Sequence, residues 1–363
     1  MARMEDHKKY QSALKVQKGI EQPPSVNPDI LGQKKRSKKY SVEEYVSGIL
    51  SGNRTILSMA ITLTESRLPK HSEKIQAVIE KCLPYSGNSI RIGITGVPGA
   101  GKSTFIESFG LYLARQGRKL AILAIDPSSQ RTRGSILGDK TRMEKLSTHP
   151  GAFIRPSPSA GTLGGVARKT REAIILCEAA GFDTILVETV GVGQSETSVQ
   201  SMVDFFLLLM LAGAGDELQG IKRGIIEMAD MIAITKADGS NRIAAEGARV
   251  SFENALHMYP SPPSGWKPGV MLCSAINNTG IEELWDKIME YNVFTKANGW
   301  WDIHRKQQEL LRMNEMINEY LNNSFHNYEN VKKIRPRLEH LLEKGRITSY
   351  RAALYLIDKY LKR

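Results

Sequence analysis

Short apolar runs alternate with longer amphipathic segments through the middle of the chain. The runs cover residues 90–94, 120–125, 184–187, 205–210, 231–235 and 269–273. Uninterrupted runs of this length are typical of strands buried on both faces, and the segments between them are long enough for helices. The alternation predicts an α/β fold over residues 87–295, with a mainly parallel sheet flanked by helices.

The segment before this domain has the pattern of helices. Ser41 followed by Glu44 fits a capping box, in which each side chain accepts a hydrogen bond from the other residue's backbone N–H. Gly52 and Asn53 break the pattern, which resumes at helical spacing over residues 56–63. We therefore expect a helical N-terminal arm over residues 41–86, ending in a boundary at residues 84–87.

Beyond Trp300 the chain lacks a strand pattern and carries an apolar stripe at helical spacing. Its members are Leu310, Leu311, Met313, Met316, Ile317, Tyr320 and Leu321. We expect a helical C-terminal extension over residues 296–363, with a turn around Pro336. A stripe of this kind packs on its own domain or pairs with a second chain, and the pattern leaves both possibilities open.

Basic residues gather in a leader over residues 1–40, which also holds Pro23, Pro24 and Pro28. The chain has 363 residues and a formal net charge of +12, which suggests a nucleic-acid partner by itself. Because no aromatic stacking motif interleaves the basic residues, we expect a flexible solvated tail and no nucleic-acid partner.

Several locations are disfavoured by the same composition. Glu5 and Asp6 stand among the first lysines without an apolar core, which argues against a signal or transit peptide. The longest apolar stretch, residues 205–214, is about half the length of a membrane span. The cysteines, at positions 82, 177 and 273, are too scattered for a disulfide framework or CxxC metal site. We expect a cytoplasmic protein without a membrane partner.

Directly after the first apolar run, the chain satisfies the pattern GxxxxGK[ST] of a phosphate-binding P-loop, and a helical segment follows. Backbone N–H groups of such a loop surround a phosphate, the lysine reaches the β and γ oxygens, and the serine ligates Mg²⁺. The expected nucleotide contacts are Gly96, Pro98, Gly99, Ala100, Gly101, Lys102, Ser103 and Thr104.

Three acidic residues are candidate Mg²⁺ ligands beside Ser103. Asp126 and Glu188 each follow an apolar run, and Glu188 resembles a Walker B carboxylate. Asp139 lies in a loop rich in Ser, Thr, Arg and Gly, which suits a switch segment. Each acid has a plainer alternative, as a cap at the sheet edge or a surface residue. Mg²⁺ prefers oxygen ligands, so the donor types match.

The residues after Glu188 are placed to meet a γ-phosphate. Gly191 is the natural sensor, because its backbone N–H can bond an oxygen that GTP has and GDP lacks. Gln194 either orients the attacking water or is an exposed loop residue.

Guanine recognition is indicated after the run 231–234, where the chain reads Thr235-Lys236-Ala237-Asp238 in place of Asn-Lys-x-Asp. The Asp238 carboxylate can accept from the N1 and N2 donors of guanine together, a pattern that adenine lacks. Ser274 and Ala275 follow the next apolar run and supply a backbone contact loop near the guanine oxygen. We expect Lys236, Asp238, Ser274 and Ala275 to contact the base.

These motifs together closely resemble the MeaB-type GTPases, which accompany adenosylcobalamin-dependent methylmalonyl-CoA mutase and have also been labelled arginine/ornithine transport kinases. The resemblance runs from about residue 41 to the C-terminus and places the chain in the SIMIBI class of P-loop proteins. It rests on GITGVPGAGKST at 93–104, DPSS at 126–129, GSILGDKTRM at 134–143, ETVGVGQSE at 188–196 and GDELQGIK at 215–222.

The resemblance implies a Mg²⁺-dependent GTPase, with bound GTP or GDP, that acts as a chaperone for the mutase. It would gate adenosylcobalamin loading and protect or reactivate the mutase. Asp126, Asp139 and Glu188 would gather around Mg²⁺, and Lys102, Asp139, Glu188 and Gln194 would form the catalytic set. Residues 216–222 would be a further switch loop, and the C-terminal helices would form a homodimer.

Two other classes share the P-loop. A kinase needs an acceptor-binding lid and a base for the acceptor hydroxyl, and neither is evident in the sequence. A metal-insertion GTPase needs spaced Cys or His ligands, whereas the histidines here are scattered.

Overall fold

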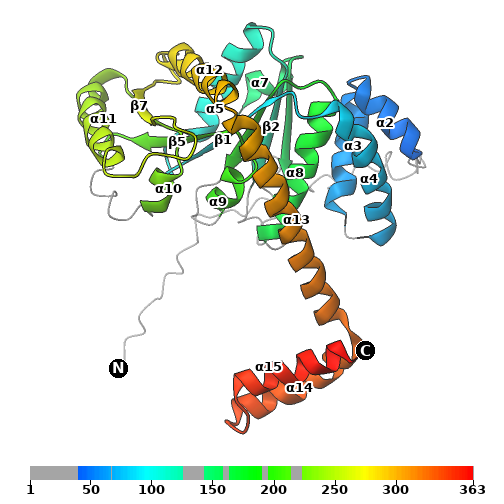
Figure 1. The fold of residues 1–363 in the computed structure, drawn as a ribbon. Coiled ribbons are helices and arrows are strands. Elements are labelled where there is room, and N and C mark those ends of the chain that lie inside the picture. Colours follow the sequence, from blue (N-terminus) through cyan, green and yellow to red (C-terminus); the bar gives the residue numbers. More distant parts are fainter. Residues whose placement is uncertain are drawn as a thin grey trace, which may run out of the picture. The chain divides into compact units, whose positions relative to one another are not determined.

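The centre of the fold is a parallel sheet (Figure 1). In the computed structural model, which describes residues 40–66, 68–125, 143–157, 163–189, 195–213 and 223–362, this sheet has seven strands. They are β1 (Ile90–Gly96), β2 (Leu120–Ile125), β3 (Ala152–Ser157), β4 (Thr184–Thr189), β5 (Phe205–Leu211), β6 (Met231–Thr235) and β7 (Gly269–Leu272). Their order is β3-β2-β4-β1-β5-β6-β7, and all neighbouring pairs are parallel.

The predicted α/β class is confirmed, and each predicted apolar run forms a strand. The strand β3 was not predicted, because Arg155 and Pro156 end its apolar run. β3 is an edge strand, and edges tolerate the missing N–H of proline.

Helices cover both faces of the sheet. The core around Ile92 and Ile94 packs on one face against α5 (Lys102–Arg115), α7 (Glu144–Thr148) and α12 (Ile281–Ala297). On the other face lie α8 (Leu163–Ala179), α9 (Ser195–Gln200), α10 (Arg223–Glu227) and α11 (Arg242–Leu256). Short 3₁₀ turns occupy Leu83–Tyr85 and Gly239–Asn241.

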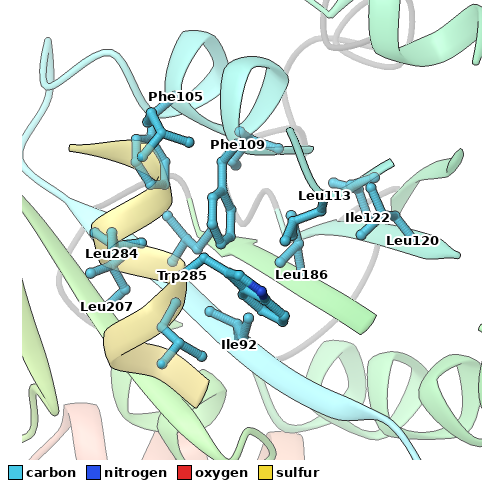
Figure 2. Packing of buried hydrophobic residues seen from close by; sticks show 14 of the residues in the cluster. Ile92, Phe105, Phe109, Leu113, Leu120, Ile122, Leu186, Leu207, Leu284 and Trp285 are labelled. Carbon is cyan, nitrogen blue, oxygen red and sulfur yellow. The ribbon is translucent and has the colours of Figure 1, made fainter. Parts of the chain in front are cut away.

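Aromatic packing fixes α5 against the sheet (Figure 2). Phe105 and Phe109 stack with their ring centroids 5.5 Å apart, and Phe109 lies 6.1 Å from Trp285 of α12. Both phenylalanines are fully buried, which stabilises the fold by roughly 2–3 kcal/mol each. The helix that follows the P-loop is therefore held firmly on the sheet.

The N-terminal arm consists of α2 (Val42–Leu50), α3 (Arg54–Glu65) and α4 (Pro69–Cys82), all in contact with α8. The predicted capping box is confirmed: the Glu44 N–H donates to Ser41 Oγ at 3.1 Å, and the Ser41 N–H donates to Glu44 Oε2 at 2.7 Å. Asn53 caps α3 by accepting from the N–H groups of Thr55 and Ile56. The leader, apart from Tyr40, lies outside the described residues.

The C-terminal extension consists of α13 (Trp300–Asn327), α14 (Glu329–Glu343) and α15 (Ser349–Leu361). The turn expected around Pro336 was wrong, because Pro336 lies inside α14 and the chain turns at Tyr328 instead. Val331 and Leu338 are buried on either side of the proline, and their packing keeps the helix intact across the hydrogen bond that proline removes. Among the described helices, none is long and apolar enough to cross a membrane.

Asp230, before β6, has an unusual ionisation. Its carboxylate accepts the Phe206 N–H at 2.8 Å, and desolvation raises the pKa of Asp230 to about 7 against the opposing effect of this bond. The folded protein therefore holds more protons here than the unfolded chain between about pH 4 and pH 7. Its contribution to stability is present at low pH and is lost as the pH rises through this window.

We expect Asp230→Asn to flatten this pH dependence, because an amide still accepts the Phe206 N–H without ionising. The free energy of unfolding is measured by urea titration at pH 5, 6 and 7.5. Between pH 5 and pH 7.5 the parent should lose roughly 2.5 kcal/mol relative to the variant, because each pH unit below the folded pKa of about 7 corresponds to roughly 1.4 kcal/mol. Asp183→Asn is the control, since Asp183 also accepts a backbone N–H, from Lys119, but is partly exposed. An equal pH dependence in parent and Asp230→Asn would contradict the assignment.

Candidate functional site

The loop between β1 and α5 has the geometry of a phosphate-binding loop. At its start, a Cβ on Gly96 would overlap the Leu209 carbonyl oxygen of β5. Gly99 and Gly101 have φ angles of +81° and +77°, in the left-handed region that favours glycine. Gly101 is the N-cap of α5, so the loop delivers the chain into a helix N-terminus, where backbone N–H groups and the helix dipole favour an anion.

Lys102 lies across this loop. Its Nζ donates to the carbonyl oxygens of Gly96 at 2.8 Å and Val97 at 3.2 Å. Desolvation lowers the pKa of Lys102, while the charges of Glu188 and Glu196 act in the opposite direction. The ammonium is thus held against two carbonyl oxygens of the P-loop, and the charges of two carboxylates act on it.

Ser103 and Glu188 present oxygens to the same region. Glu188, at the end of β4, is 8% exposed and pairs in register with Ile94 of β1. Its Oε1 lies 3.4 Å from Ser103 Oγ. A hydroxyl and a carboxylate suit Mg²⁺, which takes few protein ligands and keeps several waters. Within the described ranges, no group of three or more His, Cys, Asp or Glu residues forms a metal cluster.

Several predicted site residues fall outside the described ranges. They are Asp126, Asp139, Gly191, Gln194 and the loop 216–222. Glu196 of α9 was not predicted to have a role, yet it is buried and acts electrostatically on Lys102. Its place in the stretch after Glu188 was a signal that could have been used.

Thr235 joins the base segment to the P-loop. Its Oγ1 lies 2.8 Å from the Ala100 carbonyl oxygen and 3.0 Å from that of Met210, and it can donate to either. Lys236 follows with a φ of +56°. Its side chain lies beside Gly101 of the P-loop, since a Cβ added to Gly101 would be 3.8 Å from Lys236 Cε. The threonine thus ties β5, β6 and the P-loop together at the place where Asn was expected.

Asp238 is held by the other predicted base loop. Ser274 Oγ donates to Asp238 Oδ2 and accepts the Asn277 N–H at 3.2 Å. The Ala237 N–H donates to the Cys273 carbonyl oxygen at 3.1 Å, which fixes the two loops side by side. A hollow of about 390 Å³, lined by Thr104, Ala275 and Ile276 among others, opens between the P-loop helix and this base loop.

Comparison with known proteins identifies this arrangement. Residues 57–330 match the family described as methylmalonyl-CoA mutase-associated GTPase MeaB. The chain belongs to the MeaB family. It is 44% identical to GTPase ArgK of Escherichia coli over 89% of this chain and 97% of that protein.

A mouse relative and a solved structure extend the MeaB family match. Over 89% of this chain and 80% of the relative, identity to the mitochondrial methylmalonic aciduria type A homolog of Mus musculus is 42%. A crystal structure described as LAO/AO transport system kinase superposes with a TM-score of 0.71 and 36% identity, covering 90% of this chain and 99% of that one. The protein is a P-loop GTPase that binds guanine nucleotide.

The two hydroxyls beside the base segment should have separable effects. Ser274→Ala releases the Asp238 carboxylate, so the preference for GDP over ADP should fall about tenfold, as for other lost buried hydrogen bonds. Thr235→Ala loosens the P-loop carbonyl, so both nucleotides should bind roughly three- to tenfold more weakly at an unchanged ratio.

Competition with a fluorescent nucleotide measures both affinities in each variant. Ser108→Ala is the control, because Ser108 binds Asn278 beside the same loop without contacting Asp238 or the P-loop. The assignment fails if Ser274→Ala weakens GDP and ADP equally.

Proposed function

We propose that this GTPase is a chaperone for an adenosylcobalamin-dependent acyl-CoA mutase, with methylmalonyl-CoA mutase as the first candidate. It would act in the cytoplasm, gate cofactor loading, and protect or reactivate the mutase. The observation that carries the proposal is the MeaB family match across residues 57–330, because that family is described by its association with this mutase. The mouse relative, named for methylmalonic aciduria, supports the same direction.

In the proposed site, the P-loop from Gly96 to Thr104 holds the phosphates, and Lys102 contacts the β and γ oxygens. Ser103 and Glu188, with Asp126 and Asp139, would hold Mg²⁺, which neutralises charge on those oxygens. Lys236, Asp238, Ser274 and Ala275 would hold guanine. Gly191 would contact the γ-phosphate, and Gln194 would orient the attacking water.

The position of Lys102 supports this assignment. GTP hydrolysis needs little covalent chemistry from the protein, and its barrier is lowered mainly by positioned charge. Lys102 is already oriented by two P-loop carbonyl oxygens, and Ser103 and Glu188 lie beside it. Phosphate oxygens would replace those carbonyls as acceptors for an ammonium that needs little rearrangement.

We also propose that the C-terminal helices form a homodimer. Along α13, large apolar side chains are exposed at Leu310, Ile317 and Leu321, by 59%, 48% and 52%. α15 adds Tyr350, Leu354, Tyr355, Ile357 and Leu361. An apolar surface of this extent, on two helices, supports burial against a second copy.

The chaperone proposal is tested by phosphate release from GTP and, separately, from ATP, with and without an adenosylcobalamin-dependent acyl-CoA mutase from the same organism. We expect slow, GTP-selective hydrolysis that the mutase accelerates at least about tenfold, in the manner of partner-stimulated GTPases. Unchanged GTP turnover together with no complex with the mutase would overturn the chaperone role. Use of ATP without a mutase effect would favour a kinase.

The dimer proposal is tested by light scattering. Ile317→Glu with Leu321→Glu should convert a dimer of the full chain into a monomer, because two charges would be buried in an apolar interface. Ile243→Glu on α11 is the matched control, since Ile243 is 86% exposed and lies outside the C-terminal helices. A parent chain that is monomeric at tens of micromolar would contradict the proposal.

A further inference from the structure

The turn that follows α9, Ser201 to Asp204, is buried and is hydrogen-bonded to α13. Met202, Val203 and Asp204 are each no more than 3% exposed. On α13, Arg305 donates to both Asp204 oxygens at 2.8 Å, and Gln308 Nε2 donates to the Val203 carbonyl oxygen at 2.7 Å. α13 is therefore attached to the GTPase domain at the segment that ends α9.

A third attachment passes through Arg171 of α8. This side chain is 7% exposed and binds with both terminal nitrogens. One donates to Ser201 Oγ at 2.7 Å, and the other pairs with the Glu315 carboxylate of α13. Ser201 Oγ in turn donates to the Ser198 carbonyl oxygen within α9. Arg171 thus links the last turn of α9 to a carboxylate on α13.

The charge at the other end of α9 acts on the phosphate site. Glu196, in its first turn, is 2% exposed, and its charge raises the pKa of Lys102 against the effect of desolvation. α9 and the turn after it lie very close to the sheet: a Cβ on Gly93 of β1 would come within 2.9 Å of Val199 in α9 and 3.0 Å of Val203 in the turn. A helix this short and this closely packed moves as one body, so a shift at Ser201 would also displace Glu196.

We propose that Arg171 and Glu315 are positioning residues of the GTPase reaction: through Ser201 they hold α9, and with it Glu196, in register with Lys102. The C-terminal helix thereby sets the rate of hydrolysis from outside the nucleotide site. The Arg171–Glu315 pair borders a hollow of about 310 Å³, so an interacting protein could reach Glu315. The inference depends on GTP hydrolysis alone and not on the mutase role.

The test compares Arg171→Lys, Glu315→Gln and Ser201→Ala in the full-length protein. Lysine keeps the positive charge but lacks the planar fork of arginine. In Arg171→Lys the side chain therefore cannot bind Ser201 and Glu315 at the same time. We expect the single-turnover rate of GTP hydrolysis to fall about three- to tenfold in Arg171→Lys and Glu315→Gln, and less in Ser201→Ala. The GDP dissociation constant should change less than about twofold, because the loop and base contacts are untouched.

Arg312→Gln is the matched control. Arg312 lies on α13 between Gln308 and Glu315 and pairs with Glu309 of its own helix. The single-turnover rate of GTP hydrolysis in Arg312→Gln should equal that of the parent protein. The double variant Arg171→Lys with Glu315→Gln should be no slower than Arg171→Lys alone, because the two residues act through one contact.

The proposal is overturned if hydrolysis is unchanged in Arg171→Lys and Glu315→Gln, or if Arg312→Gln slows it equally. A parallel loss of GDP affinity and melting temperature would also overturn it, since that pattern describes a structural role only. If Arg171→Lys does not fold, Glu315→Gln decides the question, because it leaves the arginine in place.

Discussion

Gly96, at the end of β1, lies so close to β5 that the Leu209 carbonyl oxygen would overlap any Cβ there. Only glycine fits at this position, where the chain leaves β1. The P-loop begins directly after this close contact between β1 and β5. The next residue of β5, Met210, offers its carbonyl oxygen to Thr235, which also reaches Ala100 in the P-loop. Phosphate loop and base segment are consequently fixed to each other through the tight packing of two central strands.

Sequence patterns predicted the central strands well, because strands buried on both faces must be apolar throughout. β3 was overlooked for the same reason, since an edge strand accommodates Arg155 and Pro156. The turn predicted at Pro336 was wrong because the packing of Val331 and Leu338 overrides the local preference against proline in helices. Local signals with a side-chain partner three residues away, such as Ser41 and Glu44, were readable directly.

Some contacts of the site could be predicted from the sequence and others could not. Order along the chain and the strand ends placed Ser103 and Glu188 together in expectation, and their oxygens are 3.4 Å apart. The base motif placed Ser274 and Asp238 at one site without indicating their hydrogen bond, and no spacing rule connects Arg171 with Glu315. Such pairings depend on how helices sit on the sheet, and a single sequence carries no direct record of that.

Buried ion pairs position the helices at the other end of the sheet. Arg305 of α13 donates to Asp204 and to the backbone carbonyl oxygens of Gly87 and Ser89, and Arg91 of β1 pairs with Glu178 of α8 at 2.8 Å. Buried ion pairs contribute little net stability, because desolvation offsets most of the attraction, but breaking one leaves a costly unpaired charge. These pairs therefore determine the positions of α8 and α13 on the sheet, and they contribute little to the overall stability. A movement of α13 is therefore passed on to the residues that it contacts, because its buried ion pairs cannot shift to other partners step by step.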